Sequence, residues 1–325
     1  FLHENKFLTP LILWLAFALE KNKWIPSVIF TLLLLAVKED APVYAAVLGL
    51  YFIVSRRNIS KGALVFVLSI IYFITVSYFM SKYGLGTMSY RYDNFIYDGS
   101  GSLFTVIKAV ILNPIYTVHE AFDEEKIKFI LQMLVPLAFM PLMIKKPSRI
   151  ILLIPFILLN LMSDYTYQHN INFQYTYGSA AFLFYLMILN YQDMKPGFRC
   201  KVLAVAATSS IFMFMCNTYY RTSGYESYKT DKNSGAIDII DDALELVPDD
   251  SSVAATTFLV ASLYDHREVY EFESTNHRDE VEYIVLDLRI SSDDFSVDDY
   301  LNNPIYETVE NKPGYIAIFR NTTVE

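Results

Sequence analysis

The chain has 325 residues, of which 54% are hydrophobic, and its formal net charge is −9. Residues 1–220 carry 18 basic and 12 acidic side chains, whereas residues 221–325 carry 8 basic and 23 acidic ones. The acidic C-terminal part argues against nucleic acid as a partner, because phosphates are bound by Lys and Arg. Composition therefore predicts a transmembrane helical domain at 1–220 and a small, acidic α/β domain at 221–325.

The first residues are polar and precede an apolar run. The chain begins Phe-Leu-His-Glu, with no Met and no signal-peptide pattern, so we expect it to be the C-terminal portion of a longer protein. A His beside a carboxylate, as in His3-Glu4, can act as a general base or a metal ligand, or can simply cap a helix. The pair is a candidate catalytic group and equally a candidate helix start.

Apolar stretches predict a mainly α, polytopic bundle. About 20 apolar residues cross a bilayer as a helix, and we predict about eight spans, at 5–20, 24–39, 41–55, 61–81, 126–144, 149–163, 173–192 and 201–219. The first three are short for full crossings. Lys38, Glu39 and Asp40 are therefore expected at membrane depth, between two half-length helices. A competing interpretation fuses 24–54 into one kinked helix with these charges at its centre.

Four short basic stretches set the expected topology. They hold 11 of the 18 basic residues before position 221, and they lie at 21–23, 56–61, 145–149 and 195–201. Because cytoplasmic loops collect Lys and Arg, these stretches are expected inside. The other connections, and the acidic C-terminal domain, are then expected outside a multi-pass cell-membrane protein. The fused-helix interpretation would place Lys21 and Lys23 outside, so eight spans are favoured.

Two further regions have their own patterns. In the connection 82–125, the part from Tyr83 to Gly101 is predicted to be loop, and Leu103 to His119 an outer-surface helix broken near Pro114. The acidic tail alternates helical and strand patterns. A helix is predicted near 237–247, strands at 252–256, 269–272 and 283–288, and a hairpin across Asn311-Lys312-Pro313-Gly314.

Several motifs together resemble one known family. They are Phe1-x-His3-Glu4 and the run LLLAVKED that ends at Asp40, then Pro136–Pro147, Pro155–Ser163, Gln168–Tyr175, Val247–Ala255 and Tyr283–Asp287. This ordered set resembles the domain-of-unknown-function family numbered 2079, a bacterial and archaeal family of predicted membrane proteins grouped with the GT-C glycosyltransferase clan. The resemblance covers nearly the whole chain.

The resemblance implies an enzyme that transfers a sugar from a polyprenyl-phosphate donor to a surface glycan or protein at the external face. The clan usually carries a catalytic Asp or Glu in its first external loop, so we expect the main base upstream of this chain. Many relatives have His-Tyr where this chain has Gln174-Tyr175, and His169 is the candidate substitute.

Several charged and polar residues are candidates for specific roles in such an enzyme. A charge inside a membrane is costly, so Lys38, Glu39 and Asp40 are assigned either to function or to an ion cluster that locks two half-helices together. In the functional interpretation, Lys38 binds the donor phosphate, and Glu39 or Asp40 holds a divalent metal (Mg or Mn) or orients acceptor hydroxyls. The remaining candidates are His3 and Glu4 as catalytic residues, and Arg91, Gln168, His169 and Tyr175 as substrate-binding residues.

Two other functions fit the same sequence. A transporter or flippase of a lipid-linked or small polar substrate would use the membrane charges as a relay. A non-catalytic membrane scaffold would use the acidic tail to recruit a partner. No inverted repeat is visible in the sequence, which favours the transferase over the transporter.

Overall fold

The computed structural model describes residues 3–83, 89–95, 103–233, 235–273, 275, 277–289 and 296–324. Contacts divide the chain into two compact units, Phe1–Cys216 and Asn217–Glu325. The first unit is helical and the second contains a sheet, which confirms a mainly α chain with a small C-terminal α/β unit.

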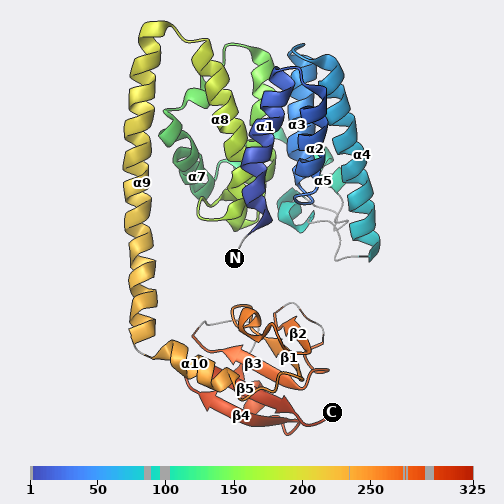
Figure 1. Ribbon diagram of the computed structural model, residues 1–325, viewed down its shortest axis with the longest axis vertical. Helices are drawn as coiled ribbons and strands as arrows, with labels where there is room; N and C mark the ends of the chain where they lie inside the picture. The colour runs from blue at the N-terminus through green and yellow to red at the C-terminus, as the bar shows by residue number, and fades with distance from the viewer. Residues whose placement is uncertain are drawn as a thin grey trace. The chain divides into compact units, whose positions relative to one another are not determined.

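The first unit is a bundle whose α-helices are joined by several short 3-10 helices (Figure 1). The α-helices are α1 Leu8–Glu20, α2 Trp24–Leu35, α3 Ala41–Val54, α4 Ile59–Tyr83, α5 Leu103–Leu112, α6 Pro114–Ala121, α7 Glu124–Leu134, α8 Tyr177–Gln192 and α9 Pro196–Asn233, the last of which continues into the second unit. The 3-10 helices are η1 Glu4–Phe7, η2 Ser89–Phe95, η3 Val135–Leu137, η4 Met140–Leu142, η5 Pro147–Leu153, η7 Thr166–His169 and η8 Gln174–Thr176, and η6 Phe156–Leu161 is a π-helix.

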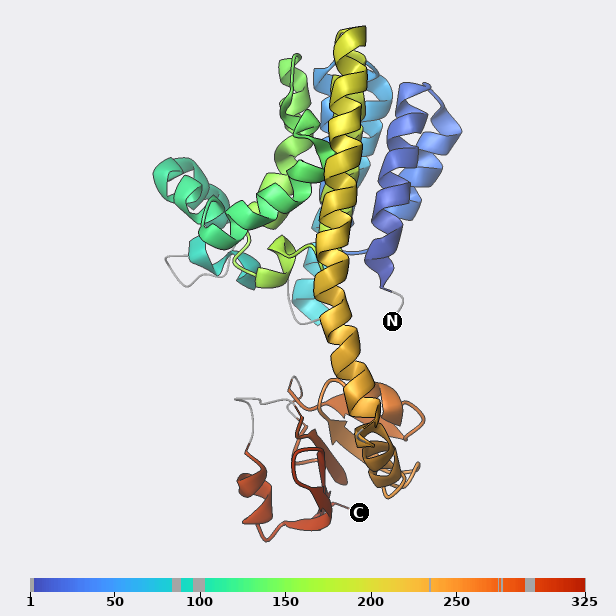
Figure 2. The same ribbon diagram turned by 90° about the vertical axis from the view of Figure 1, so that its left-hand side faces the viewer.

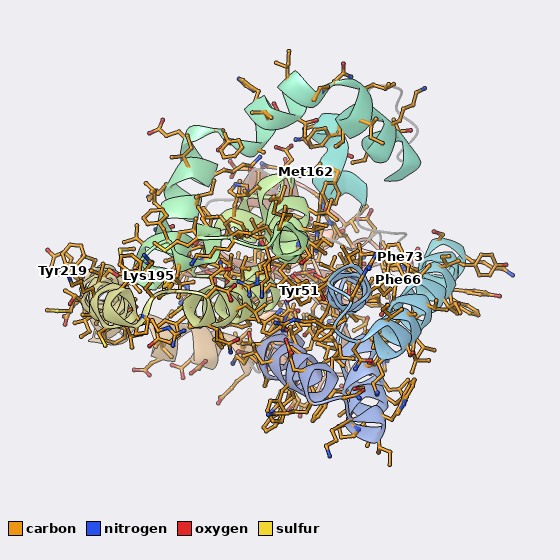
Figure 3. The ribbon with its side chains drawn as sticks, turned by 90° about the horizontal axis from the view of Figure 1, so that it is seen from above. Tyr51, Phe66, Phe73, Met162, Lys195 and Tyr219 are labelled. Carbon is orange, nitrogen blue, oxygen red and sulfur yellow. The ribbon has the colours of Figure 1, made fainter. Side chains whose placement is uncertain are left out.

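The core of this bundle lies between α1, α3 and α8. Leu48, Tyr51 and Phe182 are almost completely buried in one apolar cluster that also receives α2 and η5. Seen from above, Tyr51 lies near the middle of the bundle, while Phe66 and Phe73 lie on α4 at its margin (Figure 3). The apolar side chains of α4 that face outward, such as Ile71 and Ile74, are more than half exposed, as expected of a helix that faces lipid.

Only part of the predicted span pattern is confirmed. In the described part of the chain, two helices are long and apolar enough to cross a bilayer, Ile59–Tyr83 and the segment Pro196–Tyr219 of α9. Helices α1, α2 and α3 have 12–14 residues, so each is about 20 Å long at 1.5 Å per residue and shorter than the hydrocarbon core. Eight full spans are therefore not confirmed.

Proline explains why two predicted spans are not continuous helices. The stretch 126–144 is helical only as far as Leu134 and then makes the turns η3 and η4, with Ala138 and Phe139 at positive φ. Pro136 and Pro141 cannot donate a backbone hydrogen bond, which ends regular α-helix there. The stretch 149–163 is divided in the same way into η5 and η6 around Pro155.

The predicted helix over 103–119 and its break near Pro114 are confirmed, as two pieces, α5 and α6, which meet at Asn113-Pro114. They lie to one side of the bundle rather than within it (Figure 2). Within the preceding loop prediction, Ser89–Phe95 forms η2 and buries Phe95 against Val106 and Met162. The other parts of that prediction, 84–88 and 96–101, lie outside the described residues.

The second unit is a five-stranded sheet of order β2-β1-β3-β5-β4. Its strands are β1 Ser252–Ala255, β2 Glu268–Glu271, β3 Tyr283–Asp287, β4 Tyr306–Lys312 and β5 Ile316–Asn321, accompanied by α10 Ala236–Leu244, η9 Val260–Leu263 and α11 Val297–Leu301. Strand β1 is parallel to β2 and β3, and β5 is antiparallel to β3 and β4. Ile316 and Ile318 pack under α10, while Phe319 packs on the opposite face, as the two-residue period requires. The predicted tail strands and hairpin are confirmed, and Gly314 takes the positive φ that the turn needs.

Candidate functional site

One end of the bundle gathers the basic stretches. Asn58 Nδ2 donates to Leu19 O at 3.1 Å, and Arg57 pairs with Glu20, so the stretches at 21–23 and 56–61 lie together. Lys145 Nζ donates to Asp193 O at 2.5 Å, just before the stretch at 195–201. The turns α1–α2, α3–α4 and α8–α9 lie at this end, whereas the start of α1 lies at the other (Figure 1).

The opposite end contains the Lys38-Glu39-Asp40 loop between α2 and α3. Lys38 Nζ lies 3.3 Å from Glu4 Oε1, and its side chain is only 10% exposed. Glu4 Oε2 lies 3.0 Å from His3 Nδ1, and His3 Nε2 lies 3.0 Å from Gln174 Nε2 at the start of η8. Burial raises the pKa of Glu4, but a backbone hydrogen bond and the nearby charges of Lys38 and His3 outweigh it and hold the pKa below its usual value. The loop is thus tied to the segment before α1 and, through it, to η8.

A second cation joins Lys38 at this end. Lys38 Nζ and Arg91 Cζ each lie 5.2 Å from the centre of the Tyr175 ring, and Arg91 also lies 5.3 Å from the Tyr165 ring. When the side-chain amide of Gln168 is oriented so that both its oxygen and its nitrogen have partners, Oε1 accepts a hydrogen bond from Arg91 Nη1 at 2.9 Å. Arg91 is 5% exposed. Two positive charges are therefore buried beside one aromatic ring, an arrangement suited to an anionic ligand.

The depth of the loop follows from the packing of α3 on α4. A Cβ at Gly49 would lie 2.7 Å from both Gly62 O and Phe66 N, so the two backbones nearly touch there. From Gly49 back to Ala41 is roughly 12 Å of helix, whereas α4 continues roughly 31 Å beyond Gly62. The Lys38-Glu39-Asp40 loop therefore lies alongside α4 rather than beyond its end, as expected for charges placed between half-length helices.

The two carboxylates of the loop are partly buried. In each, one oxygen is buried and has no hydrogen-bond partner within the described structure, namely Glu39 Oε1 and Asp40 Oδ1. The charges of Glu39, Lys38 and Arg91 all lie close enough to act on the Asp40 carboxylate. A buried polar atom without a partner costs about 1–3 kcal/mol, so these oxygens suit an external ligand.

Glu39 and Asp40 fit a divalent ion of the Mg type. Mg²⁺ is often held by one or two carboxylates together with water and a substrate phosphate. Among the residues that the structure describes, no group of three or more His, Cys, Asp or Glu side chains forms a complete metal cage. The unpaired oxygens Glu39 Oε1 and Asp40 Oδ1 are therefore suited to an ion that binds together with a substrate phosphate rather than to a structural ion.

Sequence comparison places the chain in a family. The family model described as "Predicted membrane protein (DUF2079)" matches residues 2–316, nearly the whole chain. The chain belongs to this family. No curated protein and no solved structure matches it. The DUF2079 description agrees with the lipid-facing surface of α4 and assigns no reaction, so any chemistry has to be argued from the site itself.

One candidate residue of this DUF2079 chain lies away from the others. His169 Nε2 is 3.7 Å from Glu125 Oε2, and the side chain lies near Lys126 and Asp123 at the start of α7. Burial and the charge of Lys126 lower the pKa of His169, although Asp123 and Glu125 oppose the shift. The neighbouring Gln168 contacts Arg91 instead, so the short helix η7 presents adjacent residues to two different polar clusters.

The structure thus assembles Lys38, His3 and Glu4 with Arg91, Gln168 and Tyr175, and with the adjacent Glu39 and Asp40 of the same loop. This set is named the cation site below. Three further residues of this end were not predicted from the sequence: Asn5, Tyr165 and Gln174. Asn5 follows Glu4 and Gln174 precedes Tyr175 in the chain, and this adjacency is the only sequence signal for them.

Proposed function

We propose that this protein is a membrane glycosyltransferase that takes a sugar from a polyprenyl-phosphate donor and acts at the external membrane face. The observation that carries the proposal is the convergence of Lys38 and Arg91 on Tyr175, near two carboxylates that each have one buried oxygen without a hydrogen-bond partner in the described structure. The resemblance of the family to the GT-C clan supports the same class of reaction.

In this proposal the two cations hold the donor phosphate. Lys38 supplies a compact charge and Arg91 a planar fork of donors, a combination that suits a phosphate. As the bond between the sugar C1 and the phosphate oxygen breaks, negative charge grows on the leaving phosphate. Fixed cations in a water-poor site stabilise that charge. Tyr175 and Tyr165 hold Arg91 in place and offer aromatic faces to the sugar.

The acceptor hydroxyl forms the new bond to C1 and must lose its proton. Asp40 is suited to accept it, because an ionised carboxylate is a base and Asp40 lies close to the charges of Lys38 and Arg91, which would hold the phosphate. Glu39 and Asp40 are also the residues that would hold a divalent ion, which would add positive charge at the phosphate. The His3–Glu4 pair positions Lys38 through the 3.3 Å contact.

The proposed topology follows from the two ends of the bundle. The end with the basic stretches is cytoplasmic by the positive-inside rule, and the cation site is then external. Helix α9 begins at the basic end, so one crossing by α9 makes the second unit extracytoplasmic. Cys200 near the basic end is exposed and gives a native probe of the inside.

Topology can be tested with a membrane-impermeant maleimide on intact cells. A variant with Thr322→Cys, Cys200→Ser and Cys216→Ser should be labelled, because Thr322 is an exposed residue of the second unit. A matched variant that retains Cys200 as its sole cysteine should be labelled only after the cells are opened. The reverse pattern would invert the topology and place the cation site inside.

Activity is tested in cells that carry or lack the full-length gene. Their lipid-linked sugars and surface glycans are compared by mass spectrometry. The proposal expects a polyprenyl-phosphate sugar to accumulate on deletion and one sugar to disappear from a surface glycan. Glu39→Gln should reproduce the deletion while the protein is still produced. Unchanged lipids and glycans would exclude the transferase and favour transport or scaffolding.

A further inference from the structure

Asn5, in η1, is a buried amide with unmet hydrogen-bonding capacity. Its side chain is 0% exposed. Neither Nδ2 nor Oδ1 has a hydrogen-bond partner in the described part of the chain. Buried amides nearly always have partners, because each unpaired donor or acceptor costs about 1–3 kcal/mol. An amide with both ends unmet therefore calls for an explanation.

Two other fully buried asparagines in the same unit, Asn160 and Asn190, have hydrogen-bond partners. Asn160 Nδ2 donates to Gln168 O at 2.5 Å, and its Oδ1 accepts from Ser179 Oγ at 2.5 Å. Asn190 Nδ2 donates to Met140 O at 3.0 Å, and its Oδ1 accepts from Arg149 Nη1 at 2.9 Å. The bundle thus provides partners for amides that serve its own packing. Asn5 differs from both.

Asn5 adjoins a residue of the cation site in the chain. It follows Glu4, whose carboxylate pairs with Lys38. Its short helix η1 packs against η8, which carries Tyr175, and against α8. The loop that contacts Glu4 contains the unpaired oxygens Glu39 Oε1 and Asp40 Oδ1. Unmet donors and acceptors therefore occur in the segments that form the cation site.

The chemistry of these groups indicates what they bind. A carboxylate oxygen only accepts hydrogen bonds, whereas an amide both donates and accepts. A hydroxyl group also does both, so one hydroxyl can satisfy one or both ends of Asn5. A ligand that meets Lys38, Arg91 and these groups at once carries an anion next to several hydroxyls.

We propose that Asn5 is a specificity-determining residue whose side-chain amide binds a sugar hydroxyl of the substrate held by Lys38 and Arg91. The proposal rests on the phosphate site of the proposed function, and it assigns recognition of the sugar to a residue outside the catalytic set. Sites built to bind a hydroxyl discriminate strongly against analogues that lack it, because the buried polar group is then left unpaired.

The test is a binding measurement that requires no turnover. The full chain in lipid nanodiscs is titrated with inorganic phosphate and with hexose 1-phosphates of both anomers. At least one hexose 1-phosphate should bind about tenfold more tightly than phosphate. Asn5→Ala should remove this advantage and leave phosphate binding unchanged. Asn172→Ala is the matched control, because Asn172 is an exposed asparagine between η7 and η8.

A second measurement changes the ligand instead of the protein. Monodeoxy analogues of the best hexose 1-phosphate are compared on the wild type and on Asn5→Asp, which preserves the side-chain shape. Removal of the hydroxyl that Asn5 contacts should weaken binding to the wild type about tenfold and have little effect on the variant.

The outcomes separate this inference from the proposed function. Two results would overturn the role of Asn5 and leave the phosphate site standing. In the first, phosphate binds but no hexose 1-phosphate binds more tightly than phosphate. In the second, no deoxy analogue shows coupling to Asn5. If neither phosphate nor any hexose 1-phosphate binds to the wild type, both proposals fail.

Discussion

Lys38 and Glu4 are 34 positions apart in the sequence, yet Lys38 Nζ lies 3.3 Å from Glu4 Oε1 at the non-basic end of the bundle. The contact joins the segment before α1 to the loop between α2 and α3. It leaves Glu4 about half exposed and Lys38 almost buried, since their side chains are 45% and 10% exposed. The lysine charge is therefore held inside the protein, where a second, anionic partner gains most from it.

Replacement of this lysine should weaken substrate use. We expect Lys38→Met to lower kcat/KM for a polyprenyl-phosphate sugar by about 10–100-fold, because a hydrogen bond to a charged group is worth about 1.5–3 kcal/mol. Lys38→Arg should retain part of the activity. Lys6→Met is the control, since Lys6 is an exposed lysine of the same short helix as Glu4. An equal loss of kcat/KM in Lys6→Met would show that removal of any positive charge at this end has the same effect.

Activity should depend on pH through Asp40. A carboxylate must be ionised to accept a proton, so protonation of Asp40 at acidic pH should stop the reaction. If Asp40 accepts the acceptor proton, kcat/KM should fall about tenfold per pH unit once the pH is below the pKa of this base. The Asp40→Asn variant should have low activity, and its kcat/KM should no longer fall at acidic pH. If kcat/KM of this variant still falls at acidic pH, a group other than Asp40 causes the fall.

The sequence predicted much of the site but not its unmet groups. Charges in an apolar run are costly, so Lys38, Glu39 and Asp40 could be selected from composition alone. Arg91 and Gln168 come from separate loops, and the structure brings them to the same ring and to each other. Whether a buried amide such as Asn5 has a partner depends on tertiary packing, which no local pattern encodes.

The number of spans was less predictable for a physical reason. Hydropathy averages over a window and does not detect where a helix stops. Pro136 and Pro155 interrupt two apolar stretches, and the helices on either side are too short to cross a bilayer alone. The tail was easier, because strand alternation and the turn at Gly314 are local signals.

The close approach of α3 and α4 should make Gly49 sensitive to substitution. A methyl group at Gly49 would lie 2.7 Å from backbone atoms of Gly62 and Phe66, which cannot rotate away. We expect Gly49→Ala to force the helices apart and to cost about 1–3 kcal/mol of stability. Gly197→Ala in α9 is the control, because nothing lies within 4 Å of the added atom. Thermal unfolding in detergent should show a lower midpoint for Gly49→Ala alone.

The same substitution tests the position of the site. Because α3 leads directly from the Lys38-Glu39-Asp40 loop to the contact at Gly49, a shift of α3 should move the loop relative to Arg91. Gly49→Ala should therefore also weaken phosphate binding to nanodisc-embedded protein, whereas Gly197→Ala should not. Destabilisation without any change in phosphate affinity would mean that the loop is held independently of α3.

At the basic end, Arg149 should be the main stabilising contact between η5 and the end of α8. It is 1% exposed, with Nη1 2.9 Å from Asn190 Oδ1 and 2.5 Å from Asp193 Oδ2. Arg149→Met leaves both oxygens without their cation, and loss of one partner of a buried pair costs on the order of 3 kcal/mol. Lys146→Met removes an exposed cation 3.7 Å from the same Asp193 and should cost at most about 0.5 kcal/mol.

The stability difference between the wild type and Arg149→Met should depend on pH through Asp193. Burial alone would raise its pKa, but the hydrogen bond and charge of Arg149, with Lys146 and Lys145, hold the pKa below the usual value. The pair therefore stabilises the fold above the unfolded pKa of about 3.9, and the effect is lost as pH falls through the lower folded pKa. The gap in unfolding midpoint between wild type and Arg149→Met should be full near pH 6 and smaller near pH 3. A gap of constant size would mean that Arg149 acts through Asn190 and packing rather than through the carboxylate.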